Sequence, residues 1–278
     1  MLWIRASDPD PQHISKEILM PPVPAVRTVG LSQGYRNKPV IENLDLHLKP
    51  GVTGLLGPNG AGKTTRLRTL ATITPPQVGL LEIFGQAIRT ERDARRARRM
   101  IGYLSQDFGY YPSFSVKDFV RYCAWLREVP DKAAGPATLK ALEAVGLTDR
   151  AGHRMKSLSG GMLRRAGIAA AIVGSPSLVL LDEPTVGLDP AQRLDFRELI
   201  RSLAREGVAI VLSTHLVEDV GASCQTVLVL EDGQIVSSGT PQDLARQATP
   251  SAPGDSPLER GYMTVLANNR EPARETTC

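Results

Sequence analysis

Two kinds of hydrophobic pattern follow one another along this chain. Residues 25–35 read as a strand, and apolar and polar residues alternate over 41–48, which is typical of a half-buried strand. Continuous apolar runs at 52–57, 177–184 and 208–215 indicate strands that are buried on both faces. Apolar residues recur every three or four positions between about 115 and 174, and again over 193–207, which predicts amphipathic helices.

The order of these elements predicts an α/β fold. Strands alternate with helices, so we expect a mostly parallel sheet with helices on its faces. Residues 227–239 read as a hairpin with Asp232-Gly233 at its turn. The helical stretch interrupts the strands and predicts an inserted helical subdomain at about 108–174. We predict a disordered tail at 1–24, one domain at 25–248, and a linker with a short C-terminal segment at 249–278.

Composition narrows the class of protein only a little. Hydrophobic residues make up 42% and charged residues 22%, as in ordinary globular proteins. The net charge of +4 is too small to choose among nucleic acid, anionic lipid and nucleotide as partners. The three cysteines lie far apart, which argues against a disulfide framework or a zinc site. No run of eighteen apolar residues occurs, so we do not expect the chain to span a membrane by itself.

The first motif that carries chemistry is a glycine-rich loop placed after a strand and before a helix. Its glycines let backbone amides wrap around phosphate groups, and the helix N-terminus favours negative charge. Lys63 is expected to reach the β and γ phosphates, and the Thr64 hydroxyl to bind Mg²⁺. A chance glycine turn is the alternative. The loop consists of Gly57, Pro58, Asn59, Gly60, Ala61, Gly62, Lys63, Thr64 and Thr65.

An acidic pair at the end of a buried strand supplies the second motif. Asp182 is placed to hold Mg²⁺, and Glu183 to act as general base toward an attacking water. Such adjacent acids are costly unless they have cationic or metal partners. Two solvated turn acids are the alternative. Together with the loop they predict a nucleoside triphosphatase.

A third motif, SLSGGMLRR at 157–165, opens a helix shortly before the acidic pair. The Ser159 hydroxyl and the amides of Gly160 and Gly161 form another anion-binding helix N-terminus. Two such termini cannot easily grip one γ-phosphate within one chain, so we predict a head-to-tail dimer that shares two ATP molecules. An ordinary serine N-cap with flexible glycines is the alternative.

Taken together, these motifs resemble the ATP-binding-cassette (ABC) family over about residues 27–246. The resemblance implies a P-loop NTPase (RecA-like) core with an N-terminal antiparallel β part, and it makes 158–162 the signature motif, with Met162 in place of the usual glutamine. It implies that Tyr35 stacks on adenine and that Gln106 senses Mg²⁺ and the lytic water. It also implies that Asp189 belongs to the loop crossing the dimer interface, and that His215 contacts the γ-phosphate.

The same resemblance points to one branch of the family. The region after Gln106 and the C-terminal segment are similar to those of drug- and antibiotic-efflux ATPases that pair with separate membrane proteins. This implies an ATPase using ATP and Mg²⁺, homodimeric with a second cassette and bound to an integral membrane permease. It would lie in the cytoplasm on the inner face of the membrane and export a drug, antibiotic or lipid-like substrate, with no nucleic acid partner. The alternative is a soluble ABC-type ATPase such as an iron–sulfur assembly subunit.

Some residues have no clear place in this scheme. We expect Arg66 to face solvent on its helix, and Arg164 and Arg165 to solvate theirs rather than bind phosphate. The aromatic residues Tyr110, Tyr111, Phe114 and Phe119 are candidates for a groove that receives a helix of the membrane subunit. Packing within the helical subdomain explains them equally well.

Overall fold

A computed structural model describes residues 23–35 and 38–270. Most of the predicted tail at 1–24 and the last eight residues of the predicted C-terminal segment lie outside this part of the chain. Within the described ranges, no helix has the length and apolar character needed to cross a bilayer.

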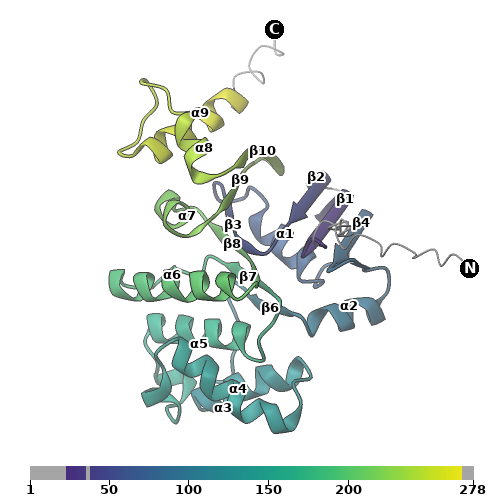
Figure 1. The fold of residues 1–278 in the computed structure, drawn as a ribbon, viewed down its shortest axis with the longest axis vertical. Helices are drawn as coiled ribbons and strands as arrows, with labels where there is room; N and C mark the ends of the chain where they lie inside the picture. Colours follow the sequence, from purple (N-terminus) through teal and green to yellow (C-terminus); the bar gives the residue numbers. More distant parts are fainter. Residues whose placement is uncertain (1–22, 36–37, 271–278) are drawn as a thin grey trace, which may run out of the picture.

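The central sheet is mostly parallel, as predicted (Figure 1). Its order is β10-β9-β3-β8-β7-β6, and β10 alone runs antiparallel, as the second strand of the predicted hairpin. All the parallel strands therefore end at one edge of the sheet. The strands are β3 (Gly51–Leu56), β6 (Ile101–Leu104), β7 (Leu178–Asp182), β8 (Ala209–Thr214), β9 (Thr226–Glu231) and β10 (Gln234–Gly239).

A smaller antiparallel sheet forms the N-terminal β part, in the order β2-β1-β4-β5. β1 pairs with β2 on one side and with β4 on the other, with register shifts along both pairings. Figure 1 shows it beside α1, at the right-hand side of the molecule. The strands are β1 (Val26–Tyr35), β2 (Lys38–Leu48), β4 (Val78–Ile83) and β5 (Gln86–Ala87).

Helices pack around the two sheets. α3, α4 and α5 lie together at the lower end in Figure 1, and α8 and α9 lie at the upper end beside β10. α2 has an arginine-rich sequence and buries only Ala94 and Ala97, so its basic face is solvated. The helices are α1 (Lys63–Leu70), α2 (Glu91–Arg98), α3 (Val116–Leu126), α4 (Asp131–Ala144), α5 (Gly160–Ile172), α6 (Pro190–Arg205), α7 (Val217–Ser223), α8 (Pro241–Arg246) and α9 (Pro257–Arg270).

The parallel sheet separates two hydrophobic cores. In β7, Val179 and Leu181 pack into the core shared with α3, α4, α5 and α6, while Leu178 and Leu180 pack into the core beside α1 and the antiparallel sheet. β8 divides its residues in the same way. Because both faces are buried, these strands are apolar throughout and show no alternation. The α/β class is thus confirmed: a mostly parallel sheet with helices packed on it and a separate N-terminal antiparallel sheet.

Candidate active site

The glycine-rich loop and the acidic pair meet at one edge of the parallel sheet. β3 pairs with β8, and β8 with β7, so that Leu56 lies opposite Thr214, and Ser213 opposite Asp182. Parallel neighbours end side by side, and ligands of open α/β sheets bind beyond their carboxyl ends. The residues that directly follow the three strands are therefore brought close together.

The glycine-rich loop joins β3 to α1 and has little room for side chains. A Cβ at Gly57 would lie 2.4 Å from the carbonyl oxygen of Leu230, so only glycine fits there. Gly60 and Gly62 have φ values of 86° and 87°, which glycine adopts without strain. These positions let the backbone curl so that its amides face a bound phosphate.

Lys63 is the first residue of α1 and is almost wholly buried. Its ammonium donates hydrogen bonds to the carbonyl oxygens of Gly57 (2.6 Å) and Pro58 (3.0 Å), and lies 3.8 Å from Oε1 of Glu183. Burial lowers the pKa of Lys63, an effect that the carboxylates of Glu183 and Asp182 oppose. The lysine is thus held within the curl of the loop, next to the acidic pair.

Asp182 ends β7 and is fully buried. One of its oxygens, Oδ1, accepts a hydrogen bond from the Ser213 hydroxyl. The other, Oδ2, is buried and has no hydrogen-bond partner among the described residues. A buried carboxylate oxygen without a partner is costly, and a divalent cation would satisfy it. No cluster of three or more His, Cys, Asp or Glu suitable for a metal occurs in the described ranges, so an ion here would need phosphate and water ligands as well.

Glu183 follows with an unusual backbone. Its φ is 49°, in the left-handed region that costs a non-glycine residue about 1–3 kcal/mol. Its amide donates to both the carbonyl oxygen and the hydroxyl of Ser213, at 3.2 and 3.0 Å. Its carboxylate lies 3.0 Å from Nδ1 of His215. This conformation turns the carboxylate toward Lys63 and His215. The sequence did not predict the contact of Ser213 with Glu183.

A cavity of about 410 Å³ joins most of the predicted site residues. Such a volume suits a small organic ligand. Tyr35, which is 46% exposed, stands at the cavity together with Gln106, the loop and the acidic pair. Val40 also contributes and was not predicted. The lining residues are Tyr35, Val40, Pro58, Asn59, Gly60, Gly62, Lys63, Thr64, Thr65, Gln106, Asp182 and Glu183.

The remaining predicted residues lie outside this cavity. Ser159 is the N-cap of α5, where its hydroxyl accepts a hydrogen bond from the Met162 amide (3.3 Å). Ser159 and Gly160 are both exposed. Asp189 caps α6 by accepting from the Gln192 amide at 2.8 Å. The two caps are neighbours, because a Cβ at Gly161 would meet Gln192 Oε1 at 2.5 Å. They form a separate exposed edge made of two helix N-termini.

Comparison with known proteins settles the family. The model of a family described as ABC transporter matches residues 41–186, which is more than half of the chain. The chain belongs to the ABC transporter family. It is an ATP-binding domain of that family, whose members hydrolyse ATP.

Relatives agree with this ABC assignment. A Nod factor export ATP-binding protein I from Cupriavidus metallidurans is 36% identical over 243 residues, which cover 87% of this chain and 77% of that protein. The linearmycin resistance ATP-binding protein LnrL from Bacillus subtilis is 32% identical over 216 residues, covering 77% and 69%. A solved ATP-binding subunit of an ABC transporter superposes with a TM-score of 0.76 at 25% identity, covering 87% of this chain and 99% of that one.

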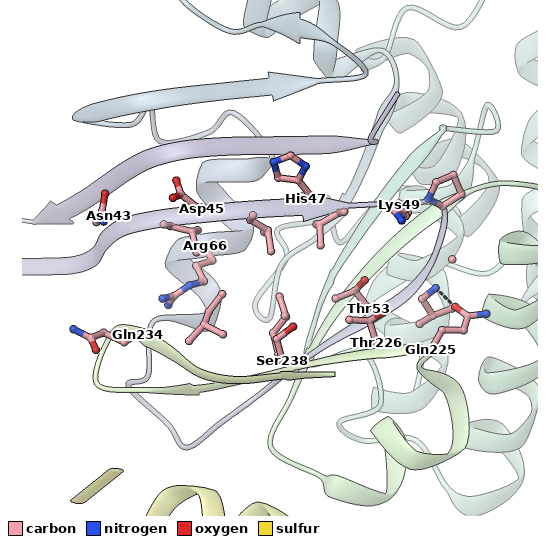
Figure 2. A pocket seen from close by; sticks show the side chains of 18 of the residues that line it. Asn43, Asp45, His47, Lys49, Thr53, Arg66, Gln225, Thr226, Gln234 and Ser238 are labelled. Atoms are coloured by element: carbon pink, nitrogen blue, oxygen red, sulfur yellow. Dashed lines mark hydrogen bonds between the residues drawn. The ribbon is translucent and has the colours of Figure 1, made fainter. Parts of the chain in front are cut away.

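Arg66 does not face solvent, contrary to the sequence prediction. It is 3% exposed and donates hydrogen bonds to the carbonyl oxygens of Ala61 (3.2 Å) and Gly233 (2.6 Å). Figure 2 shows its guanidinium between β2 and the β9–β10 hairpin, at a groove of about 840 Å³. Burial lowers the pKa of Arg66 to about 10. In this ABC domain, Arg66 ties the phosphate loop to the hairpin, a long-range contact that helical periodicity does not reveal.

Arg164 is a second correction. It is 7% exposed, and its guanidinium lies beneath the acidic pair instead of solvating α5. Arg165 is half-buried and donates to the carbonyl oxygens of Val145 and Gly146, both at 3.1 Å. Both arginines bind backbone carbonyls, so charge alone was a poor guide to their position.

The four aromatic candidates divide between a groove and the core. Tyr110, Tyr111 and Phe119 line a groove of about 650 Å³ together with Phe108, Tyr122 and Leu126. Phe119 is also buried in the core shared by the helices. Phe114 is absent from that lining among the described residues and instead packs on Tyr111, with ring centroids 4.8 Å apart. The lining of this groove includes residues 108–111, which lie shortly after Gln106 in the chain.

Proposed function

We propose that this chain is the ATP-hydrolysing subunit of an exporter, working through a separate membrane permease. The observation that carries the proposal is the cavity in which Lys63, Gln106 and the acidic pair converge on the glycine-rich loop. The export and resistance functions named for its relatives support transport out of the cell. They do not favour the iron–sulfur assembly alternative. The substrate class that we propose is a drug, antibiotic or lipid-like molecule.

The site residues divide into those that hold the nucleotide and those that act on water. The loop amides and Lys63 bind the phosphates, and Tyr35 stacks on adenine. Thr64, Gln106 and Asp182 would hold Mg²⁺, which would neutralise charge on the phosphates. Glu183 accepts a proton from the attacking water, and His215 orients Glu183 and contacts the γ-phosphate. The unpartnered Oδ2 of Asp182 supports the metal assignment.

A second copy of the chain would complete the site. Ser159, Gly160, Gly161 and Asp189 lie outside the cavity, yet they present two exposed helix N-termini that suit a phosphate. In a head-to-tail dimer, this edge of one chain would cover the loop of the other. We therefore propose an ATP-dependent homodimer.

The membrane partner is proposed to dock on the aromatic groove. Tyr111 is 51% exposed and Leu126 57%, so apolar side chains are open to a partner there. The groove is continuous with the segment that follows Gln106, which links it to the nucleotide cavity. This arrangement would place the chain in the cytoplasm, on the inner face of the membrane.

Co-purification from membranes tests this docking. Tagged chain, solubilised in mild detergent, is expected to bring down one integral membrane protein, identified by mass spectrometry. Tyr111→Arg should greatly reduce that recovery without changing ATP binding, because it places a charge in the groove. Leu139→Arg serves as the matched control, because Leu139 is equally exposed on α4 but outside the groove. Recovery of iron–sulfur proteins with no membrane protein would instead support the alternative.

Tyr35→Ala is expected to weaken ATP binding about fivefold or more, because stacking of a base on an aromatic ring is worth at least about 1 kcal/mol. Tyr35→Trp should keep the affinity. The measurement is the Kd for ATP beside that for inorganic tripolyphosphate, which has no base. An equal loss for both ligands would contradict a role in binding adenine.

A further inference from the structure

Arg164 makes an unusual set of contacts beneath the active site. Its guanidinium donates to five backbone carbonyl oxygens. Nε donates to Pro184 (3.3 Å), and Nη2 to Asp182 and to Glu183 (2.6 Å). Nη1 donates to Ser105 (3.1 Å) and to Gln106 (2.9 Å). A single side chain thus holds the backbone at both acids and at the predicted Mg²⁺-sensing glutamine.

These carbonyls belong to segments far apart in the sequence. Ser105 and Gln106 follow β6, whereas Asp182, Glu183 and Pro184 span the end of β7. Arg164 itself lies one turn into α5, which begins after Ser159. The guanidinium of Arg164 therefore connects Glu183, the proposed general base, with Gln106 and with α5. The exposed N-terminus of α5 is the one that we assign to the second nucleotide.

The backbone at Glu183 needs such support. Its φ of 49° is maintained only if surrounding contacts over-determine it. Ser213 holds the amide of Glu183, and Arg164 holds the carbonyls before, at and after that residue. A planar guanidinium presents five donors in a fixed fork, which an ammonium cannot reproduce.

We propose that Arg164 is a positioning residue for ATP hydrolysis, which fixes Glu183 and Gln106 relative to each other and to helix α5. The inference rests on the proposed role of Glu183 as general base. Arg164 has no part in binding the nucleotide, because it is absent from the residues lining the cavity in the described structure. Loss of the Arg164 guanidinium should therefore lower kcat more than it weakens ATP binding.

Arg165 provides a matched control on the same helix. Its guanidinium also donates to two carbonyls, but these belong to the two residues that follow α4, and not to the acidic pair. Arg165→Lys removes a guanidinium from α5 without disturbing the contacts of Arg164. Any general weakening of α5 should appear in both variants.

The test compares Arg164→Lys with Arg165→Lys for kcat, KM, the Kd of ATP and the Tm, all assayed well below the Tm. For Arg164→Lys, we expect kcat to fall about tenfold or more, since small displacements of a reacting group are costly. The Kd of ATP should stay within about twofold of the wild-type value, because the lost interaction supports the reaction and not nucleotide binding. Arg165→Lys should leave kcat and the Kd of ATP close to the wild-type values. If Arg164→Lys does not fold, Arg164→Gln, which keeps two donors, takes its place.

A double-mutant cycle separates positioning from mere stability. In the Glu183→Gln chain, single-turnover hydrolysis should fall little further when Arg164→Lys is added, because the base that Arg164 positions is already gone. A full additive loss, a normal kcat for Arg164→Lys, or an equal loss for Arg165→Lys would overturn the inference. Normal hydrolysis by Glu183→Gln alone would refute the proposed general base instead, so the two failures are distinguishable.

Discussion

Glu183→Gln is expected to slow ATP hydrolysis by about 10²- to 10⁴-fold, the contribution typical of a general base. The amide keeps the size of the carboxylate but cannot accept the proton of the attacking water. ATP binding should persist, because the loop and Lys63 are unchanged. The variant should then accumulate as an ATP-bound dimer, seen as a doubling of mass by light scattering.

The matched control for this change is Glu143→Gln, because Glu143 is exposed on α4 and does not line the cavity. It removes the same charge and should leave hydrolysis and mass unaffected. Hydrolysis at the normal rate by Glu183→Gln would show that another group activates the water. His215 lies 3.0 Å from that carboxylate and would be the next group to test.

Ser159→Arg is expected to reduce hydrolysis by about 10²-fold or more, the loss typical when a preorganised anion-binding group is removed. The large cation would block the N-terminus of α5 from a second nucleotide. Binding of ATP to the variant's own loop should remain, because Ser159 lies outside the cavity. The measurements are steady-state hydrolysis, the Kd of ATP and the mass in saturating ATP.

Mixing variants reveals whether the site is shared. Ser159→Arg and Lys63→Met should each be inactive alone, whereas their mixture forms dimers with one intact loop facing one intact signature motif. Hydrolysis by the mixture should then exceed that of either variant alone. Gly152→Arg is the control, because Gly152 is exposed between α4 and α5 and a Cβ there would meet nothing within 4 Å. Unchanged activity of Ser159→Arg would count against the dimer.

The sequence predicted the parts of this protein that depend on local pattern. β7 and β8 were recognised because strands buried on both faces are apolar throughout, and the glycine-rich loop because its backbone tolerates so few residues. The meeting of Lys63, Gln106 and the acidic pair at one cavity followed from the parallel topology.

Prediction failed where a side chain acts over a long distance in sequence. Arg66 and Arg164 occupy helix positions that look like ordinary charged sites, yet both are buried by partners 167 and up to 59 residues away. Helical periodicity places a residue on a face of its own helix but does not say what covers that face. The role of Ser213 was missed for the same reason, since it acts through a neighbouring strand.

The left-handed backbone at Glu183 has a consequence for which residues this position can tolerate. Valine, isoleucine and threonine fit such a φ poorly. In a library of substitutions at this position, those variants would be lost through misfolding, whatever their effect on ATP hydrolysis. Asparagine and aspartate adopt it more easily, and glycine without strain. Screens that score only ATPase activity would therefore confuse two kinds of failure. Expression level read alongside turnover would sort the variants into those that cannot form the bend and those that form it but lack the proton acceptor.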